Sequence, residues 1–261
     1  MLTAEKIKQN MIRIMKQMSA ACPRITYVNA PGVNRYESDL PHSLFNRVIA
    51  YQCMESETAI GDIEVIASHY RARNLPFSWL VWSHDDEARD LARVLENLGL
   101  TKSSYSPGMS LPLSNWTFNT TTIPNFEIKP IRTTLEFAWF KEIVLPTFGL
   151  KGDTGDVFMQ INEAIGTNDQ TILQHYVGFL DGHPAGAATA FQEGDTIGIY
   201  NVATVEAYRR RGIGSAMTAH AIREGQVSGA QLAVLQSSEL GVNVYRELGF
   251  KEEVAIEFYL G

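Results

Sequence analysis

Residues 209–216 read Arg-Arg-Arg-Gly-Ile-Gly-Ser-Ala, between a strand-like segment that ends near Thr204 and a helical pattern that begins near Gly212. Glycines let a ligand approach the backbone closely. The N–H groups in the first turn of a helix have no partner within the helix, and the helix dipole favours an anion there. A strand, a glycine-rich turn and a helix in this order therefore predict a phosphate-binding turn.

Two common phosphate motifs do not fit this turn. A dinucleotide fingerprint would require a third glycine at position 217, which is Met217, and the chain lacks the GxxxxGK[ST] pattern of a P-loop. Three adjacent arginines suit a ligand with several phosphates, such as coenzyme A, because guanidinium groups bind phosphate oxygens in pairs. An ordinary strand–helix turn with an exposed basic patch is the alternative that the turn alone leaves open.

The turn and a second segment together resemble a known family. Arg209-x-x-Gly212-x-Gly214 after a strand is similar to the acyl-CoA motif of the GNAT acetyltransferase superfamily. About 36 residues after Arg209, Tyr245-Arg246-Glu247-Leu248-Gly249-Phe250 resembles the closing helix of that family, in which a tyrosine precedes a Gly-Phe pair. The resemblance covers residues 126–261. It implies direct transfer of an acetyl group from acetyl-CoA, as co-substrate, to an amine.

The second half of the chain alternates between strand and helix patterns. We expect strands over Phe126–Arg132, Thr171–Leu180, Pro184–Phe191, Thr196–Thr204, Gln231–Gln236 and Val254–Tyr259. We expect helices over Leu135–Val144, Asp156–Ile165, Gly212–Val227 and Ser238–Leu248. This order predicts an α+β fold with an antiparallel start and a parallel pair of strands at its end.

The first half resembles a degenerate second copy of this unit, since residues 77–113 repeat the order strand, helix, glycine, strand of residues 231–260. Within the first half, segments 44–48 and 106–109 are similar to those of tandem bacterial members of the superfamily. Its expected elements are an amphipathic helix with Ile7, Met11, Ile14, Met15 and Met18 on one face, a helix over Glu57–Arg73, a strand over Phe77–Trp82, a helix over Glu87–Leu98 and a strand over Met109–Leu113. The first helix packs on its own domain or binds a membrane surface or a partner. This half has no counterpart of the arginine–glycine turn, so we expect it not to bind coenzyme A.

We place a boundary in the uncharged stretch 115–125, which lacks a clear period and ends in turn residues. The expected architecture is two GNAT-like α/β/α lobes with mixed sheets. Residues 1–114 would form the degenerate lobe, residues 115–125 the linker, and residues 126–261 the complete lobe.

The resemblance implies a set of coenzyme-binding residues: Val202, Ala203, Thr204, Arg209, Arg210, Arg211, Gly212, Ile213, Gly214, Ser215 and Ser238. The thioester would lie where the strand ending at Thr204 separates from the strand over Gln231–Gln236. Backbone N–H groups of Val202 and Ala203 would face its carbonyl oxygen as an oxyanion hole. Ser238-x-x-Gly241 stands where relatives often have Asn-x-x-Ala, and Ser238 can still form hydrogen bonds.

Tyr245 is the expected general acid. A phenol with a pKa of about 10 is protonated at pH 7 and can donate to a thiolate whose conjugate acid has a pKa near 8.5. The alternative is a core aromatic residue on one helix face with Val242 and Leu248. Spacing alone does not separate the two roles.

The sequence does not single out a general base. Many relatives have an acidic residue or a histidine on the strand before the turn, but residues 199–202 read Ile-Tyr-Asn-Val. Glu193 at the preceding hairpin and Glu142 on the first helix of the second half are candidates, as is a water molecule ordered by Tyr200 or Asn201. We therefore name Tyr245, Asn201 and Glu193 as the catalytic set.

Composition restricts the partners. A net charge of −7 argues against nucleic acid and makes cationic acceptors such as polyamines, aminoglycosides or lysine-bearing peptides more plausible. The only cysteines, Cys22 and Cys53, form no CxxC pair, and the histidines show no HExxH spacing, so we expect no metal. We see no signal peptide and no run of about 20 apolar residues, and expect a cytoplasmic protein that does not bind membranes.

Two other classes of function remain open alongside the N-acetyltransferase. The missing strand carboxylate favours a non-catalytic acyl-CoA-binding regulator, whereas Tyr245 argues against one. An interaction module, whose first half binds a partner, is the other class. The acceptor amine and the formation of a homodimer are also open at this stage.

Overall fold

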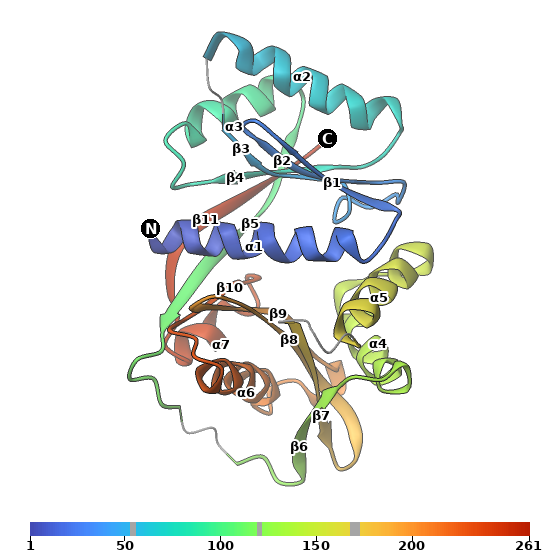
Figure 1. Cartoon of the computed structure of the whole chain (residues 1–261), viewed down its shortest axis with the longest axis vertical. Coiled ribbons are helices and arrows are strands. Elements are labelled where there is room, and N and C mark those ends of the chain that lie inside the picture. The colour runs from blue at the N-terminus through green and yellow to red at the C-terminus, as the bar shows by residue number, and fades with distance from the viewer. Residues whose placement is uncertain (53–55, 119–121, 168–172) are drawn as a thin grey trace.

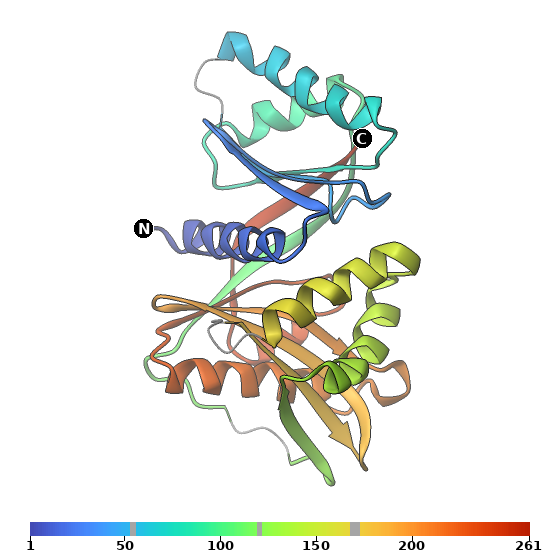
Figure 2. The same cartoon turned by 45° about the vertical axis from the view of Figure 1, so that its right-hand side comes forward.

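The computed structural model describes residues 1–52, 56–118, 122–167 and 173–261. Its strands form one 11-stranded sheet in the order β1-β2-β3-β4-β11-β5-β10-β9-β8-β7-β6 (Figure 1). In the C-terminal half, α6 packs on one face of strands β7, β8 and β9, and α4 packs on the other (Figure 2). The chain therefore has the expected α+β class, with a mixed sheet between helical layers.

The C-terminal half contains each element that the sequence predicts. Its strands are β6 Phe126–Ile131, β7 Leu173–Leu180, β8 His183–Glu193, β9 Thr196–Thr204, β10 Leu232–Gln236 and β11 Lys251–Leu260. Its helices are α4 Thr134–Phe148, α5 Gly152–Gly166, the short 3₁₀ helix η1 Glu206–Tyr208, α6 Ile213–Val227 and α7 Val242–Glu247. The predicted parallel pair is β9 with β10. Residues 171–172, predicted as the start of β7, lie outside the described residues.

Three helix boundaries differ from the predictions. Helix α5 begins at Gly152, four residues before the predicted Asp156. Helix α4 continues past Pro146 to Phe148, because Ile143 and Val144 hold the preceding turn in the core and Gly149, with φ +66°, ends the helix. Residues 238–241 form a turn instead of the start of α7, because the Ser238 hydroxyl accepts a hydrogen bond from the N–H of Gly241.

The N-terminal half contains three strands that the sequence analysis missed. Its elements are α1 Thr3–Ala20, β1 Ile25–Ala30, β2 Val33–Ser38, β3 Arg47–Tyr51, α2 Ser56–Ala72, β4 Ser78–Trp82, α3 Ala88–Asn97 and β5 Thr101–Pro112. Strands β1 and β2 are only partly buried and rich in polar residues, so they lack a clear apolar alternation. Strand β5 is longer than predicted because its first residues are polar and exposed.

The final strand of each half lies against the other half. Strand β11 is inserted between β4 and β5, with Ile256 opposite Trp82. Strand β5 in turn pairs with β10, with Ser110 opposite Val234. Figure 1 shows both long strands running from one half of the molecule to the other. Cutting the chain at residues 115–125 would therefore not separate two complete sheets.

Helix α1 crosses between the two halves and is part of the core (Figures 1 and 2). Ile7, Met11 and Ile14 are buried, and the helix contacts β1, β5, β9, β10 and α5. The apolar face is therefore packed inside the chain, as one of the interpretations expected, but against both halves and not only the N-terminal one. Within the described ranges, no helix is long and apolar enough to cross a membrane.

Candidate active site

Strands β9 and β10 separate at the position that the sequence suggested. Their parallel pairing runs from Thr196 opposite Leu232 to Gly198 opposite Val234. Beyond this point β9 continues to Thr204, while β10 follows β5 as far as Gln236. The result is a gap between two parallel strands that opens toward the residues preceding α6.

A bulge in β9 lies at the start of this gap. Ala187 is opposite Ala203 and Thr189 is opposite Tyr200, so Asn201 and Val202 together face one residue of β8. Asn201 has a φ of +51°, a left-handed conformation that asparagine tolerates better than most residues. The bulge interrupts the ladder to β8. On the other edge of β9, the loss of β10 as a neighbour beyond Gly198 leaves peptide groups beside the gap without a strand partner.

The predicted phosphate turn is open at the N-terminus of α6. Gly212 has a φ of +79°. Its carbonyl oxygen accepts a hydrogen bond from the N–H of Ala216, which is the first hydrogen bond of the helix. Among the described residues, no acceptor faces the backbone N–H groups of residues 211–215. A Cβ added to Gly214 would meet only the Thr204 hydroxyl, at 3.8 Å. This space and these donors fit an anionic group at a helix N-terminus.

The three arginines of the turn are exposed and free of carboxylate partners in the described part of the chain. The Arg209 side chain donates to the Thr204 carbonyl at 3.4 Å, and the Arg211 guanidinium lies 5.6 Å from the ring centre of Tyr208. Arg210 has a φ of +62°. The turn thus presents positive charge beside its free N–H groups, as a ligand with several phosphates requires.

Tyr245 lies on α7, next to the end of β10. Its side chain is 9% exposed, and its ring packs edge-on against Phe250 at 6.0 Å. Its hydroxyl forms no hydrogen bond within the described residues, yet the oxygen is not fully buried. Burial raises the pKa of Tyr245 to about 12. The ring therefore has the packing of a core residue, and its hydroxyl remains available as a donor.

The structure brings only part of the predicted catalytic set to the gap. Asn201 lies there, whereas Glu193 lies at the β8–β9 hairpin before the strands separate and forms an ion pair with Arg13 at 3.0 Å. Glu142 is exposed on α4. The Ser238 hydroxyl is used by the turn before α7.

Behind Asn201, a row of polar side chains that the sequence did not predict crosses the sheet. The Asn201 amide donates to the Thr189 hydroxyl at 3.0 Å and to the Asn162 side-chain oxygen at 3.4 Å, and Thr189 contacts His175 Nδ1 at 2.8 Å. His175 and Thr189 are fully buried, and burial lowers the pKa of His175 to about 3. His175, Thr189 and Asn201 lie on three different strands and Asn162 lies on α5, so only the register of β7, β8 and β9 and the packing of α5 on β7 reveal the row.

The N-terminal half also reaches the start of the gap. Asn10 of α1 accepts a hydrogen bond from the Tyr200 hydroxyl at 2.6 Å. Its side chain occupies space directly over Gly198, where a Cβ would collide with it. Burial raises the pKa of Tyr200, so the phenol stays neutral. Helix α1 therefore forms a wall of the site on the face of the sheet opposite α6.

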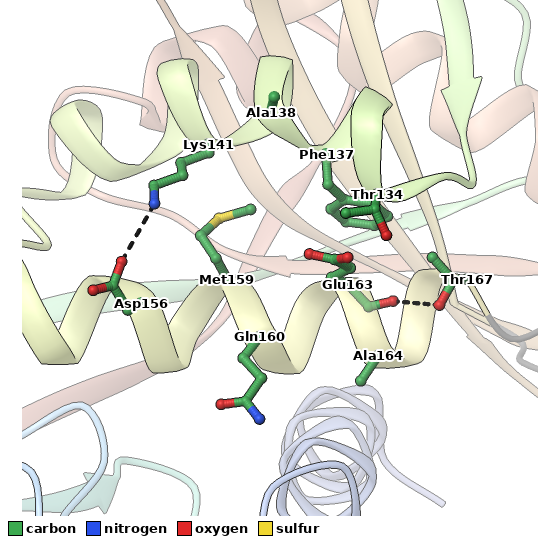
Figure 3. Close-up of a pocket in the computed structure, with 10 residues that line it drawn as sticks. All are labelled: Thr134, Phe137, Ala138, Lys141, Asp156, Met159, Gln160, Glu163, Ala164 and Thr167. Atoms are coloured by element: carbon green, nitrogen blue, oxygen red, sulfur yellow. Dashed lines mark hydrogen bonds and ion pairs between the residues drawn. The ribbon is translucent and has the colours of Figure 1, made fainter.

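A separate groove of about 560 Å³ lies between α4 and α5 (Figure 3). Phe137 and Met159 form an apolar part of its lining, and Glu163 points into it (Figure 3). Lys141 and Asp156 form an ion pair across it at 3.3 Å. None of its lining residues belongs to the phosphate turn, so the groove is not the coenzyme site. No group of side chains in the described ranges could hold a metal ion.

Comparisons with known proteins agree with this geometry. Residues 140–250 match the model of the acetyltransferase (GNAT) family. No curated protein matches the sequence. Among solved structures, a GCN5-related N-acetyltransferase from Kribbella flavida is similar, with a TM-score of 0.72, 19% identity and coverage of 99% of this chain and 95% of that chain.

Two further solved structures have the same arrangement. A GCN5-related N-acetyltransferase from Sphaerobacter thermophilus has a TM-score of 0.68 at 15% identity, covering 91% of this chain and 80% of that chain. A tandem GNAT protein from the clavulanic acid biosynthesis pathway has a TM-score of 0.62 at 11% identity, covering 98% of this chain and 95% of that chain. At such identities the similarity establishes the fold, which is a tandem one.

Proposed function

Because residues 140–250 form a domain of the GNAT acetyltransferase family within a tandem fold, we propose that this chain transfers an acetyl group from acetyl-CoA to a primary amine of a small molecule or peptide. The observation that carries the proposal is the gap between β9 and β10, which leads to an open phosphate turn. A pantetheine arm fits between two separated strands because each offers peptide groups for hydrogen bonds.

The phosphate turn would hold the pyrophosphate of the coenzyme. Residues 211–215 supply N–H donors, and the arginines at 209–211 supply charge. Backbone groups of Val202, within the bulge, and of Ala203, directly after it, would face the thioester oxygen. Since the N-terminal half has no such turn, we propose that one chain binds one coenzyme.

In the proposed reaction, the amine nitrogen attacks the thioester carbonyl carbon and the carbon–sulfur bond breaks. The departing thiolate takes a proton from the Tyr245 hydroxyl, which has no other partner in the described part of the chain. The attacking nitrogen loses its proton to water, because no carboxylate on β9 faces the gap. Amines that are already partly neutral at working pH would therefore be the better acceptors.

One specific observation favours the second candidate, a regulator that binds acyl-CoA without turnover. Glu193 is paired with Arg13, and β9 carries no carboxylate or histidine beside the gap. Release of free coenzyme A thiol distinguishes the two functions. We expect thiol release from acetyl-CoA in the presence of at least one amine from a panel of ethanolamine, spermidine, glucosamine and a lysine peptide.

A mass shift of one acetyl group on the amine confirms the transfer in the same experiment. The Gly214→Glu variant is the matched control for coenzyme-independent chemistry, because its side chain would fill the phosphate turn. Tight binding of acetyl-CoA without acetylation of any amine would instead support the regulator.

A further inference from the structure

We propose that Thr189 is a positioning residue that holds the Asn201 carboxamide as the hydrogen-bond acceptor for the attacking amine, within a network completed by His175 and Asn162. This inference rests on the proposed acetyltransferase function. It concerns side chains behind the gap that no sequence motif marks.

Both hydrogens of the Asn201 amide have acceptors inside the network. Its Nδ2 group carries two hydrogens, and the structure gives it two acceptors, the Thr189 hydroxyl at 3.0 Å and Asn162 Oδ1 at 3.4 Å. Asn162 is itself oriented, because its own amide donates to the Phe158 carbonyl at 2.7 Å. Both Nδ2 hydrogens of Asn201 are therefore used inside the network, and its Oδ1 has no partner among the described residues.

The Thr189 hydroxyl lies between Asn201 and His175 and can accept from one and donate to the other. Its oxygen accepts from Asn201, so its hydrogen is free to donate to His175 Nδ1, 2.8 Å away. We assign His175 the tautomer that carries its hydrogen on Nε2, a buried nitrogen with no hydrogen-bond partner among the described residues. This assignment requires a neutral ring, which burial ensures by lowering the pKa of His175 to about 3. In this tautomer His175 is the acceptor for Thr189, and its lowered pKa makes it a weak base.

The Asn201 side chain, with its free oxygen, is carried by the part of β9 that borders the gap. Asn201 is partly exposed, lies on the bulge of β9 beyond the last residue paired with β10, and is kept there by a left-handed backbone. Thr189 and His175 are fully buried on the neighbouring strands. An amide oxygen is too weak a base to remove a proton, but it can accept one N–H of the amine. The amine lone pair is then directed toward the thioester, which is an orientation effect.

The decisive variant is Thr189→Val, which keeps the branched shape and removes only the hydroxyl. We expect the kcat/KM for the best amine of the panel to fall about tenfold while the Kd of acetyl-CoA stays within about twofold. Thr189→Ser restores the hydroxyl and should restore most of the activity. Thr196→Val is the matched control, since Thr196 is also buried in the sheet but its hydroxyl donates to Asp195 at the hairpin.

A second measurement does not depend on turnover. In a ¹H–¹⁵N spectrum the side-chain amide protons of Asn201 should exchange slowly in the wild-type chain and in Thr189→Ser, and quickly in Thr189→Val. Fast exchange in the wild type would overturn the network. Unchanged amine kinetics in a folded Thr189→Val protein would overturn the positioning role.

Failure of the proposed function would give a different experimental result from failure of the positioning role. If Asn201 is protected but no amine is acetylated by the wild type, the network exists and both the acetyltransferase function and the amine-orienting role are refuted. A loss of activity that Thr196→Val reproduces, or that Thr189→Ser does not rescue, would show that Thr189 is only structural.

Discussion

Replacing Tyr245 by phenylalanine should lower kcat strongly without affecting folding or coenzyme affinity. The hydroxyl forms no hydrogen bond within the described residues, so its removal breaks no internal contact, and we expect the free energy of unfolding to change by less than about 0.5 kcal/mol. The ring itself stays packed against Phe250. A general acid contributes about 10²–10⁴-fold, and we expect a decrease near 100-fold because water can partly replace the phenol.

The assay is steady-state release of coenzyme A thiol with saturating amine, combined with calorimetry of acetyl-CoA binding and a thermal melt. Because burial raises the pKa of Tyr245 to about 12, the phenol remains protonated throughout the usual assay range. The wild-type kcat should therefore show no decrease between pH 8 and pH 10 that depends on Tyr245. Tyr245→Ala is unsuitable, since loss of a buried ring costs about 3–5 kcal/mol. A kcat for Tyr245→Phe within about threefold of the wild type would refute the acid role.

Three other predictions test the rest of the site. Gly214→Glu should abolish acetyl-CoA binding in calorimetry, whereas Gly214→Ala, whose Cβ meets only the Thr204 hydroxyl at 3.8 Å, should fold and bind within about tenfold of the wild type. Titration of the intact chain should give one acetyl-CoA per chain, and a second equivalent would contradict the assignment of the N-terminal half as a scaffold. Gly198→Ala should lower Tm by several degrees, because overpacking against Asn10 costs about 1–3 kcal/mol, and Asn10→Ala in the same chain should recover part of the loss.

The phosphate turn could be predicted from the sequence because all its determinants are local. The order of strand, arginines, glycines and helix specifies free N–H groups at a helix N-terminus wherever the turn lies in the fold. The separation of β9 from β10 was predicted as well, because the resemblance of residues 209–214 to the acyl-CoA motif implies it. The candidate acid, Tyr245, was found by its spacing from Gly249 and Phe250.

The rest of the site depends on strand register, which a single sequence does not encode locally. Thr189 lies among small apolar residues of β8 and His175 lies in an apolar strand, so neither stands out until β7, β8 and β9 are aligned. Glu193 was chosen as a carboxylate at the hairpin that precedes β9, yet in space Arg13 of α1 is its partner. The exchange of final strands between the halves has no sequence signal either, since β11 has an ordinary strand pattern.

This exchange has a consequence for the order of events during synthesis. Strand β11 leaves the ribosome after every other strand of this sheet, and it is the partner of β4, which is made about 170 residues earlier. At about 5–20 residues per second, the edge of β4 stays without its neighbour for roughly 10–30 seconds. Such long-range pairing makes folding slow and leaves an unpaired edge exposed meanwhile. The two halves therefore complete their shared sheet together, only once β11 has been made, although the proposed coenzyme turn is encoded in only one of them.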